Sequence, residues 1–203
     1  MNHWEQVYTS KSPDAVSWFQ PKAAQSLAWI VECADKDSQI IDIGGGASTL
    51  VDDLLATSFK HLSVLDLSAA ALKIVQQRLG EAAKQVNWLV GDITSIALPE
   101  HAYDVWHDRA VFHFLTEPAQ RAAYRRQLAC ALKSNGQLII ATFAADGPEK
   151  CSGLPVQRYL VEQLAAEFAP EFSLIKSVAE LHATPFGTQQ SFIYCHFQRE
   201  NQS

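Results

Sequence analysis

The sequence predicts a single α/β domain built on a doubly wound, mostly parallel, seven-stranded sheet that ends in an antiparallel strand pair. Three observations support this fold class. Short apolar runs alternate with amphipathic helical segments, and the runs are apolar on both faces, which is typical of a parallel sheet covered on both sides. The last two runs follow each other without a helix between them. With 203 residues, the chain can form one full core but not two.

The elements follow in order from the N-terminus. Residues 1–35 are expected to form an arm and then a helix, which begins near Pro21 because proline suits the first helical turn. Further helices are expected at residues 48–58, 68–80, 117–133 and 155–168. Strands are expected at residues 39–43, 62–67, 86–92, 103–108, 136–143, 172–181 and 190–198. Residues 38–145 therefore form the core, and residues 146–203 add an insertion, the last helix and the antiparallel strands.

Composition and charge exclude several classes of function. The net charge of −6 provides no broad basic field, so nucleic acid is excluded as the expected partner. No apolar stretch is long enough to cross a bilayer, and no secretory signal is visible at the N-terminus. The four cysteines are far apart and the seven histidines lack metal-ligand spacing, which indicates a cytoplasmic protein with reduced thiols and no metal site.

A glycine-rich turn follows the first predicted strand, in the stretch IIDIGGGAS. A strand, such a turn and a helix together present backbone N–H groups to a ligand, and both dinucleotides and S-adenosylmethionine use this geometry. The dinucleotide fingerprint requires a glycine where this chain has Thr49. Asp42, directly before the turn, would also repel a pyrophosphate, whereas it would attract the ammonium and sulfonium of S-adenosylmethionine.

The same stretch resembles the first motif of class I S-adenosylmethionine-dependent methyltransferases, acid-x-Gly-x-Gly-x-Gly. Asp42, Gly44 and Gly46 match the motif, and Ser48 stands where a glycine is usual. The resemblance implies a Rossmann-like methyltransferase fold that holds the cofactor in residues 38–145, with residues 1–35 as a lid and the acceptor side in residues 146–203. Gly45, within the turn, is included among the expected cofactor contacts.

Acids at the ends of the next two strands extend this resemblance. By resemblance, Asp66 accepts both ribose hydroxyls of the cofactor with Leu67 beside it, because ligands of open α/β sheets lie at the carboxyl ends of the strands. Asp92 would accept from the adenine amino group, with Ile93 against the ring. Each acid could instead cap the following turn, but three acids in register with a glycine turn favour cofactor binding.

In the family that this chain resembles, the segment after the fourth strand passes beneath the transferable methyl group. Its sequence HDRA resembles the Asp-Arg-Gly of thiopurine-type and some small lysine methyltransferases, with Ala110 in place of glycine. We expect Asp108 to orient the cofactor or the acceptor, and His107 to contact the cofactor. Asp108 or His113 could act as general base for an amine or hydroxyl acceptor, whereas a thiolate needs none. His113 could equally be a buried structural histidine.

Aromatic residues of the arm resemble the lid of small-molecule methyltransferases, and Trp18 is the main candidate to close over the cofactor, with Tyr8 and Phe19 beside it. The expected function is methyl transfer to a small molecule, with a sulfur or other soft nucleophile as one option. Two alternatives stay open, a protein lysine methyltransferase and a cofactor-binding protein without catalysis. A nicotinamide-dependent oxidoreductase is excluded, since no tyrosine has a lysine four residues later.

Overall fold

The computed structural model describes residues 3–10, 12 and 16–201, and the remaining parts of the expected N-terminal arm, residues 1–2, 11 and 13–15, lie outside the described residues. The α-helices are α1 (His3–Ser10), α2 (Ala24–Cys33), α3 (Leu50–Ala56), α4 (Ala69–Leu79), α5 (Pro118–Ala131) and α6 (Val161–Phe168). Two 3-10 helices are η2 (Gly80–Gln85) and η3 (Phe112–Phe114).

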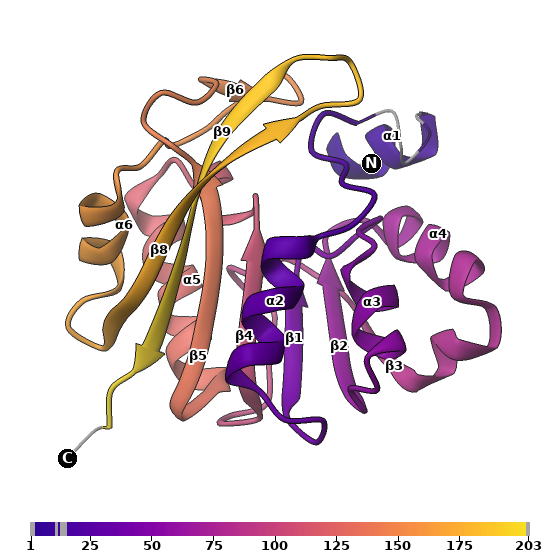
Figure 1. Cartoon of the computed structure of the whole chain (residues 1–203), viewed down its shortest axis with the longest axis horizontal. Helices are drawn as coiled ribbons and strands as arrows, with labels where there is room; N and C mark the ends of the chain where they lie inside the picture. The colour runs from indigo at the N-terminus through magenta and orange to yellow at the C-terminus, as the bar shows by residue number, and fades with distance from the viewer. Residues whose placement is uncertain (1–2, 11, 13–15, 202–203) are drawn as a thin grey trace.

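The main sheet contains seven strands in the order β3-β2-β1-β4-β5-β9-β8 (Figure 1). The seven-stranded, mostly parallel sheet is what the sequence predicts, and the structure adds the strand order. These strands are β1 (Gln39–Ile43), β2 (His61–Asp66), β3 (Val86–Val90), β4 (Tyr103–Arg109), β5 (Leu132–Phe143), β8 (Phe172–Ala183) and β9 (Gln189–Arg199). Strands β1 to β5 run parallel, while β9 is antiparallel to both β5 and β8. The order reverses at β1, next to β4, where ligands bind in open sheets of this kind.

Two apolar clusters cover the two faces of the sheet, because successive strand residues point to opposite sides. Ile41 belongs to the cluster that packs under α5 and α6, and Ile40 to the one that packs under α2, α3 and α4. Trp106 on β4 is completely buried in the first cluster, and its Nε1 donates to the hydroxyl of Tyr124 on α5 at 2.8 Å. The predicted double-sided burial is therefore confirmed.

Three segments differ from the expected elements. Residues 3–10, expected as irregular arm, form the helix α1, which lies beside α4 near one end of the strands (Figure 1). The last helix begins at Val161 and not at residue 155, because Tyr159 pairs with Ala144 in an isolated β-bridge. The insertion contains a two-stranded hairpin of β6 (Lys150–Cys151) and β7 (Leu154–Pro155).

Residues 16–20 cross the carboxyl ends of the strands and are tied to distant parts of the sheet. The carbonyl of Ser17 lies 2.8 Å from His182 Nε2, and the side-chain nitrogen of Gln20 donates to Glu180 Oε1 at 2.9 Å. The carbonyl of Gln20 accepts from Thr49 Oγ1 at 3.2 Å. Among the residues that the structure describes, none of the helices combines the length and the apolar character needed to cross a bilayer.

Candidate active site

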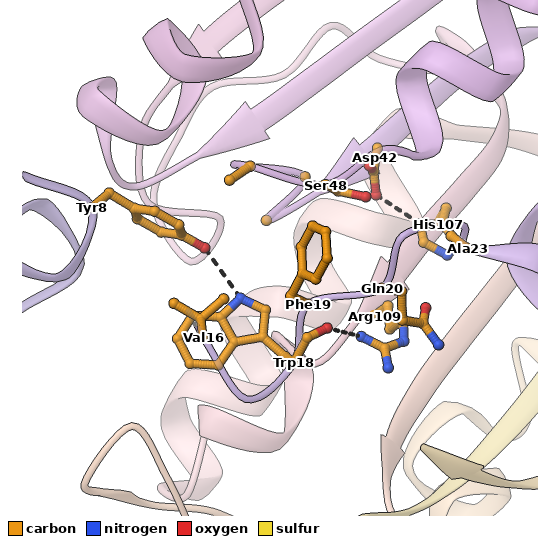
Figure 2. Close-up of a pocket in the computed structure, with 13 residues that line it drawn as sticks. Tyr8, Val16, Trp18, Phe19, Gln20, Ala23, Asp42, Ser48, His107 and Arg109 are labelled. Atoms are coloured by element: carbon orange, nitrogen blue, oxygen red, sulfur yellow. Dashed lines mark hydrogen bonds and ion pairs between the residues drawn. The ribbon is translucent and has the colours of Figure 1, made fainter. Parts of the chain in front are cut away.

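Two adjoining cavities open at the carboxyl ends of β1, β2 and β4. The smaller cavity has a volume of about 50 Å³ and the larger one about 300 Å³. Four residues line both of them: Tyr8, Trp18, Gly44 and Arg109. Figure 2 shows Phe19 in the smaller cavity next to Asp42 and Ser48, with the hydroxyl of Tyr8 pointing toward the indole nitrogen of Trp18.

The glycine turn forms the floor of this site, and it has no room for side chains. Gly44 has a φ of +67°, in the left-handed region that favours glycine. A Cβ on Gly45 would lie 2.5 Å from Oδ2 of Asp42, and one on Gly46 would lie 2.6 Å from Oδ2 of Asp66. The glycines thus allow the backbone to approach two carboxylates closely. Gly44 and Gly45 line the cavities, whereas Gly46 lies beneath them.

Asp42, at the end of β1, is held by a histidine from the neighbouring strand. It is buried, and its Oδ1 lies 2.6 Å from Nδ1 of His107 on β4. Nε2 of His107 lies 2.8 Å from the hydroxyl of Ser26 on α2. Asp42 and His107 both line the smaller cavity. Both ring nitrogens of His107 thus lie within hydrogen-bond distance of other side chains, and the expected contact of His107 with the cofactor stays a prediction.

Asp66, at the end of β2, is also buried and lines the larger cavity. Its Oδ1 accepts from the backbone N–H of Ser68 at 2.8 Å. Burial raises the pKa of this carboxyl to about 7, with a contribution from the nearby charge of Asp42 and against the effect of the backbone hydrogen bonds. A group that donates to Asp66 from the cavity would favour its ionised form.

The third acid has a different environment. Asp92 follows β3 and is exposed, and its Oδ1 accepts from both the backbone N–H and the hydroxyl of Thr94, at 2.8 and 2.7 Å. It therefore caps the turn after the strand and lines the larger cavity at the same time. Ile93, which is buried, and Leu67 line that cavity beside it.

Asp108 lies beneath the site and not on the wall of either cavity. It is completely buried, and its oxygens accept from the backbone N–H groups of Val111 and Phe112 and from the hydroxyl of Tyr124, the last at 2.7 Å. Burial raises its pKa to about 6, although these donors oppose the shift. Asp108 is therefore the hydrogen-bond acceptor that holds the turn after β4 in place. Its direct contact with the cofactor or the methyl acceptor stays a prediction, which this placement does not support.

His113, in η3, is also completely buried and outside the lining of both cavities. Its Nδ1 accepts from the backbone N–H of Phe143 at 3.3 Å, and its ring packs against Phe114 and Phe143. Burial lowers its pKa to about 3, so it is a weak base at neutral pH. This placement corresponds to the structural alternative that the sequence left open, and a catalytic role stays a prediction.

Aromatic rings from α1, the arm and η3 form one wall of the larger cavity. The ring of Trp4 packs edge-on against Trp18 and Phe114, with centroid distances of 5.6 and 4.9 Å. Nε1 of Trp18 donates to the hydroxyl of Tyr8 at 3.2 Å. Trp18 and Trp4 of the arm thus line the larger cavity together with Phe114, which was not expected there. That Trp18 closes over the cofactor stays a prediction.

Arg109 is the only basic residue in the lining of the larger cavity, among the residues that the structure describes. Its Nε donates to the hydroxyl of Tyr194 at 2.9 Å, and its Nη1 donates to the carbonyl of Trp18 at 3.0 Å. The guanidinium lies 4.6 Å from the ring centre of Phe192, and its Nη2 is 3.8 Å from Glu180. The arginine therefore ties the arm to strand β9.

Sequence reasoning placed the acids and the turn but missed the residues that hold them. Ser26 carried a usable signal, since it is a polar residue on the face that α2 buries with Trp29 and Ile30. Tyr194 carried none, because it sits among the apolar residues of a buried strand. The part of the chain that the structure describes holds no group of three or more His, Cys, Asp or Glu side chains suited to a metal ion.

Comparison with known proteins finds a family match over part of the chain. Residues 40–136 match the methyltransferase domain family. Two curated relatives are an eEF1A lysine and N-terminal methyltransferase homolog of Drosophila melanogaster, 20% identical over 68% of this chain, and EEF1A lysine methyltransferase 2 of Danio rerio, 25% identical over 79% of it. The matches cover 21% of the fly protein and 66% of the zebrafish protein, so this chain spans less than two thirds of either.

Solved structures agree on the fold. One is the 1,6-didemethyltoxoflavin-N1-methyltransferase of Burkholderia thailandensis, determined with 1,6-didemethyltoxoflavin and S-adenosylhomocysteine bound. It superposes with a TM-score of 0.68 at 17% identity, over 96% of this chain and 81% of that one. The domain match, the strand order and the glycine turn with its acids lead to one conclusion: residues 40–136 match the methyltransferase domain family, and the chain as a whole has the fold of solved S-adenosylmethionine-dependent methyltransferases.

Proposed function

We propose that this protein binds S-adenosylmethionine in the two adjoining cavities and transfers its methyl group to a small-molecule acceptor. The observation that carries the proposal is the glycine turn set against two buried carboxylates, Asp42 and Asp66. The residues present fit this cofactor, because a Cβ would fill the cradle at Gly45 and Gly46, and because carboxylates suit both a cationic tail and ribose hydroxyls.

The cofactor contacts proposed here follow from the two linings. Asp42 would attract the cationic tail of the cofactor, Asp66 would accept from the ribose, and Asp92 from the adenine amino group. The other residues proposed to contact the cofactor are Gly44, Gly45, Leu67, Ile93, His107 and Trp18. Gly46 belongs to the same turn but lies outside both linings, and it is proposed to contribute through the backbone of the turn. The bound cofactor supplies a methyl group already activated on a sulfonium, so the chain mainly supplies orientation and a water-excluding pocket.

Helix α1 and residues 16–20 are proposed to act as a lid over this site. Both segments contribute to the lining, through Trp4 and Tyr8 and through Trp18. Glu5 fixes α1 to the start of α4, since its Oε2 accepts from the hydroxyl of Ser68 at 2.6 Å. A lid of this kind excludes water from the reacting atoms.

The charges of the larger cavity favour a small, neutral or anionic acceptor over a lysine ammonium. The two acids in its lining, Asp66 and Asp92, are both assigned to the cofactor. The remaining charged side chain of the lining is Arg109, which is positive. The rest of the wall is mainly apolar and aromatic, with Trp4, Val111, Phe114, Cys151 and Leu154. Arg109 would repel a cationic acceptor there, and the two carboxylates in the lining are already assigned to the cofactor.

The acceptor proposed is one that needs no general base, such as a thiol that reacts as its anion. Asp108 and His113, the expected bases, lie outside both linings, and His113 has a pKa lowered to about 3 by burial. Cys151 lines the cavity, but burial raises its pKa to about 11, so it is a wall residue and not a nucleophile.

A protein lysine is the second candidate acceptor, and the two curated relatives support it, since both are described as lysine methyltransferases. For this chain, the charge of the cavity argues against it. The same cavity would have to accept a lysine side chain beside Arg109.

The proposal is tested first by calorimetric titration with S-adenosylhomocysteine, with NAD as the negative ligand. We expect micromolar or tighter binding of S-adenosylhomocysteine and none of NAD. Asp66→Asn should weaken this binding, whereas Asp37→Asn should not, because Asp37 is an exposed acid paired with Lys60 away from the cavities. Absence of binding in folded protein would overturn the cofactor assignment.

The acceptor is then identified by S-adenosylhomocysteine release with a panel of aliphatic and aromatic thiols, small amines, and purified elongation factor 1A as the lysine-bearing protein. We expect turnover with members of the small-molecule set. Turnover with the elongation factor alone would replace the small-molecule proposal with the lysine alternative, and no turnover with any acceptor despite cofactor binding would favour a binding protein without catalysis.

A further inference from the structure

One edge of the main sheet is open and apolar. Strand β8 is the last strand of the sheet and pairs on one side with β9, while its other side is open in the described chain (Figure 1). Half of the large apolar side chains that are exposed among the described residues lie on this one strand, and they are Leu174, Ile175, Val178 and Leu181. An open edge of this kind offers unpaired backbone N–H and C=O groups to a further strand.

Most of β8 is regular enough to accept a further strand. Residues 176–183 pair with β9 in one unbroken register, and the register shifts between Leu174 and Lys176, so that Ile175 is left out of the ladder. Regular pairing therefore begins after Ile175. The strand at the opposite edge of the sheet, β3, has five residues against the twelve of β8. Strand β8 is thus the longer template for pairing.

The side chains of this segment follow the same chemical order from either end. The stretch Ile-Lys-Ser-Val-Ala-Glu-Leu, residues 175–181, has Val178 at its centre. On the two sides of Val178 stand first two small residues, then two charged residues of opposite sign, and then two apolar residues. The segment is therefore complementary to a second copy of itself that runs in the opposite direction.

Antiparallel pairing of two such strands about Val178 brings the matching positions together. Each residue then faces the one at the same distance on the other side of the centre, so that Lys176 of one copy faces Glu180 of the other. In the same way, Ile175 faces Leu181. Opposite charges and apolar pairs at facing positions stabilise an antiparallel pair. A register shifted by one residue in either direction would separate the two charges, so the sequence favours this register.

The two charged side chains are placed to reach across such a pair. Lys176 and Glu180 lie on the same face of the strand, because alternate residues point to the same side. Lys176 Nζ lies 2.5 Å from Glu32 Oε2 on α2. Glu180 Oε1 lies 3.8 Å from Arg109 Nη2. The side chains of Lys176 and Glu180 remain 29% and 23% exposed, so both are accessible to a further chain. Pairing would join these ion pairs into a row of alternating sign.

We propose that β8 pairs antiparallel with β8 of a second copy of this chain, centred on Val178, so that the two sheets join into one. The complementarity of residues 175–181 with themselves selects a second copy as the occupant of this edge. A contact along one short segment is small beside a standard interface of about 1,200–2,000 Å². We therefore expect a reversible dimer with a dissociation constant in the micromolar range. The proposal does not depend on which ligand the active site binds.

Sedimentation velocity of the full chain, from low to high micromolar concentration, tests the dimer. The average mass should rise from that of one chain toward that of two. Val178→Lys places two ammonium groups against each other at the centre of the pair, and it should raise the dissociation constant at least about tenfold. Val178 is 39% exposed, so the fold should accept the lysine, which circular dichroism and thermal unfolding verify.

The matched control is Val90→Lys, which changes an exposed valine of the opposite edge strand, β3. This variant should dimerise as the unmodified protein does. A chain that stays monomeric at every concentration would overturn the proposal. So would a dimer that survives Val178→Lys and is lost in Val90→Lys.

Cysteine cross-linking tests the register of the pair. In Val178→Cys, the two new thiols face each other at the centre, where Cβ atoms are about 4.5–5.5 Å apart, and mild oxidation should give a disulfide-linked dimer. In Leu181→Cys, the two thiols would be about 20 Å apart, at roughly 3.3 Å per residue, and should not cross-link. Leu181 is 61% exposed and so the more accessible of the two positions, which makes it a strict control.

The unmodified protein gives the background of this assay, because Cys33 and Cys130 are partly exposed. Cross-linking of Val178→Cys well above this background, with none for Leu181→Cys, supports the register. Cross-linking of Leu181→Cys that is as fast as that of Val178→Cys would contradict it.

Discussion

At the scale of single residues, four aspartates near the strand ends differ because their surroundings differ. Asp92 is exposed and caps a turn, while Asp42 and Asp66 are buried beside backbone and side-chain donors. Asp108 is the most deeply buried and is surrounded by donors from its own turn and from Tyr124. The sequence places all four at strand ends, but only burial and partners separate a cofactor contact from a structural acceptor.

The raised pKa of Asp66 predicts a pH-dependent cofactor affinity. Its carboxyl has a pKa of about 7 in the free protein, and a ribose that donates to it favours the ionised form, so binding should release a proton below that pH. The affinity for S-adenosylhomocysteine should therefore be constant above about pH 8 and fall as the pH drops through 7, approaching tenfold per pH unit. Calorimetry from pH 5.5 to 8.5, in two buffers of different ionisation enthalpy, measures both the affinity and the proton.

Asp66→Asn provides the control for this pH dependence. The variant should bind more weakly, and its affinity should change little across pH 6 to 8, because the titrating group is gone. An unchanged pH profile in the variant would assign the titration to another group.

The burial and the partners of Asp108 predict that its substitution lowers the stability of the fold and not the rate of methyl transfer. The carboxylate of Asp108 accepts from three donors, the N–H groups of Val111 and Phe112 and the hydroxyl of Tyr124. In Asp108→Asn, one carboxylate oxygen becomes an amide nitrogen, which cannot accept a hydrogen bond. At least one of the three donors is then left without a partner. We expect the free energy of unfolding to fall by about 2 kcal/mol. Urea unfolding measures this change, while methyl transfer per folded molecule should fall much less than a hundredfold. Normal stability with a collapsed rate would instead make Asp108 a catalytic residue.

At the scale of elements, α1 shows what local sequence could not predict. A helix of eight residues is too short to be stable by itself, and the segment reads as an irregular arm. It forms because Val7 is buried and because Glu5 accepts from Ser68 Oγ and from the Ala70 N–H at the start of α4. Long amphipathic helices such as α5 and the alternating strands were predictable, since their periodicity is sustained over many residues.

The contact between Glu5 and α4 predicts faster cofactor exchange when it is removed. A carboxylate at a helix N-terminus is favoured by the helix dipole, and the hydrogen bond from Ser68 lowers the pKa of Glu5. In Glu5→Ala, α1 should detach more often, so radiolabelled S-adenosylmethionine should exchange several times faster while the thermal stability changes little. Glu81→Ala, an exposed acid paired with Lys84, is the matched control and should exchange at the unmodified rate. Equal exchange in both variants would show that α1 does not limit ligand release.

At the scale of the whole molecule, the mostly parallel sheet with its antiparallel pair could be predicted, because helices separate all the strands but the last two. The strand order β3-β2-β1-β4-β5-β9-β8 comes from the structure. That order brings the ends of β1, β2 and β4 together, which is why acids far apart in sequence meet at one site. The packing of α2 against β9 could not be predicted in the same way, because pairing between buried positions of distant elements leaves no periodic signal. Trp29 of α2 and Tyr194 of β9, whose rings pack edge-on with centroids 6.0 Å apart, belong to this class of contact, and only the folded chain identifies it.

The aromatic wall of the larger cavity also gives the protein an optical property. Of its five tryptophans, Trp4 and Trp18 line that cavity, whereas Trp29, Trp88 and Trp106 do not. Indole fluorescence responds to the polarity around the ring, so a ligand that displaces water from this wall should shift the emission of two tryptophans and leave the other three as an internal reference. The protein can therefore report the filling of its own active site without an added dye.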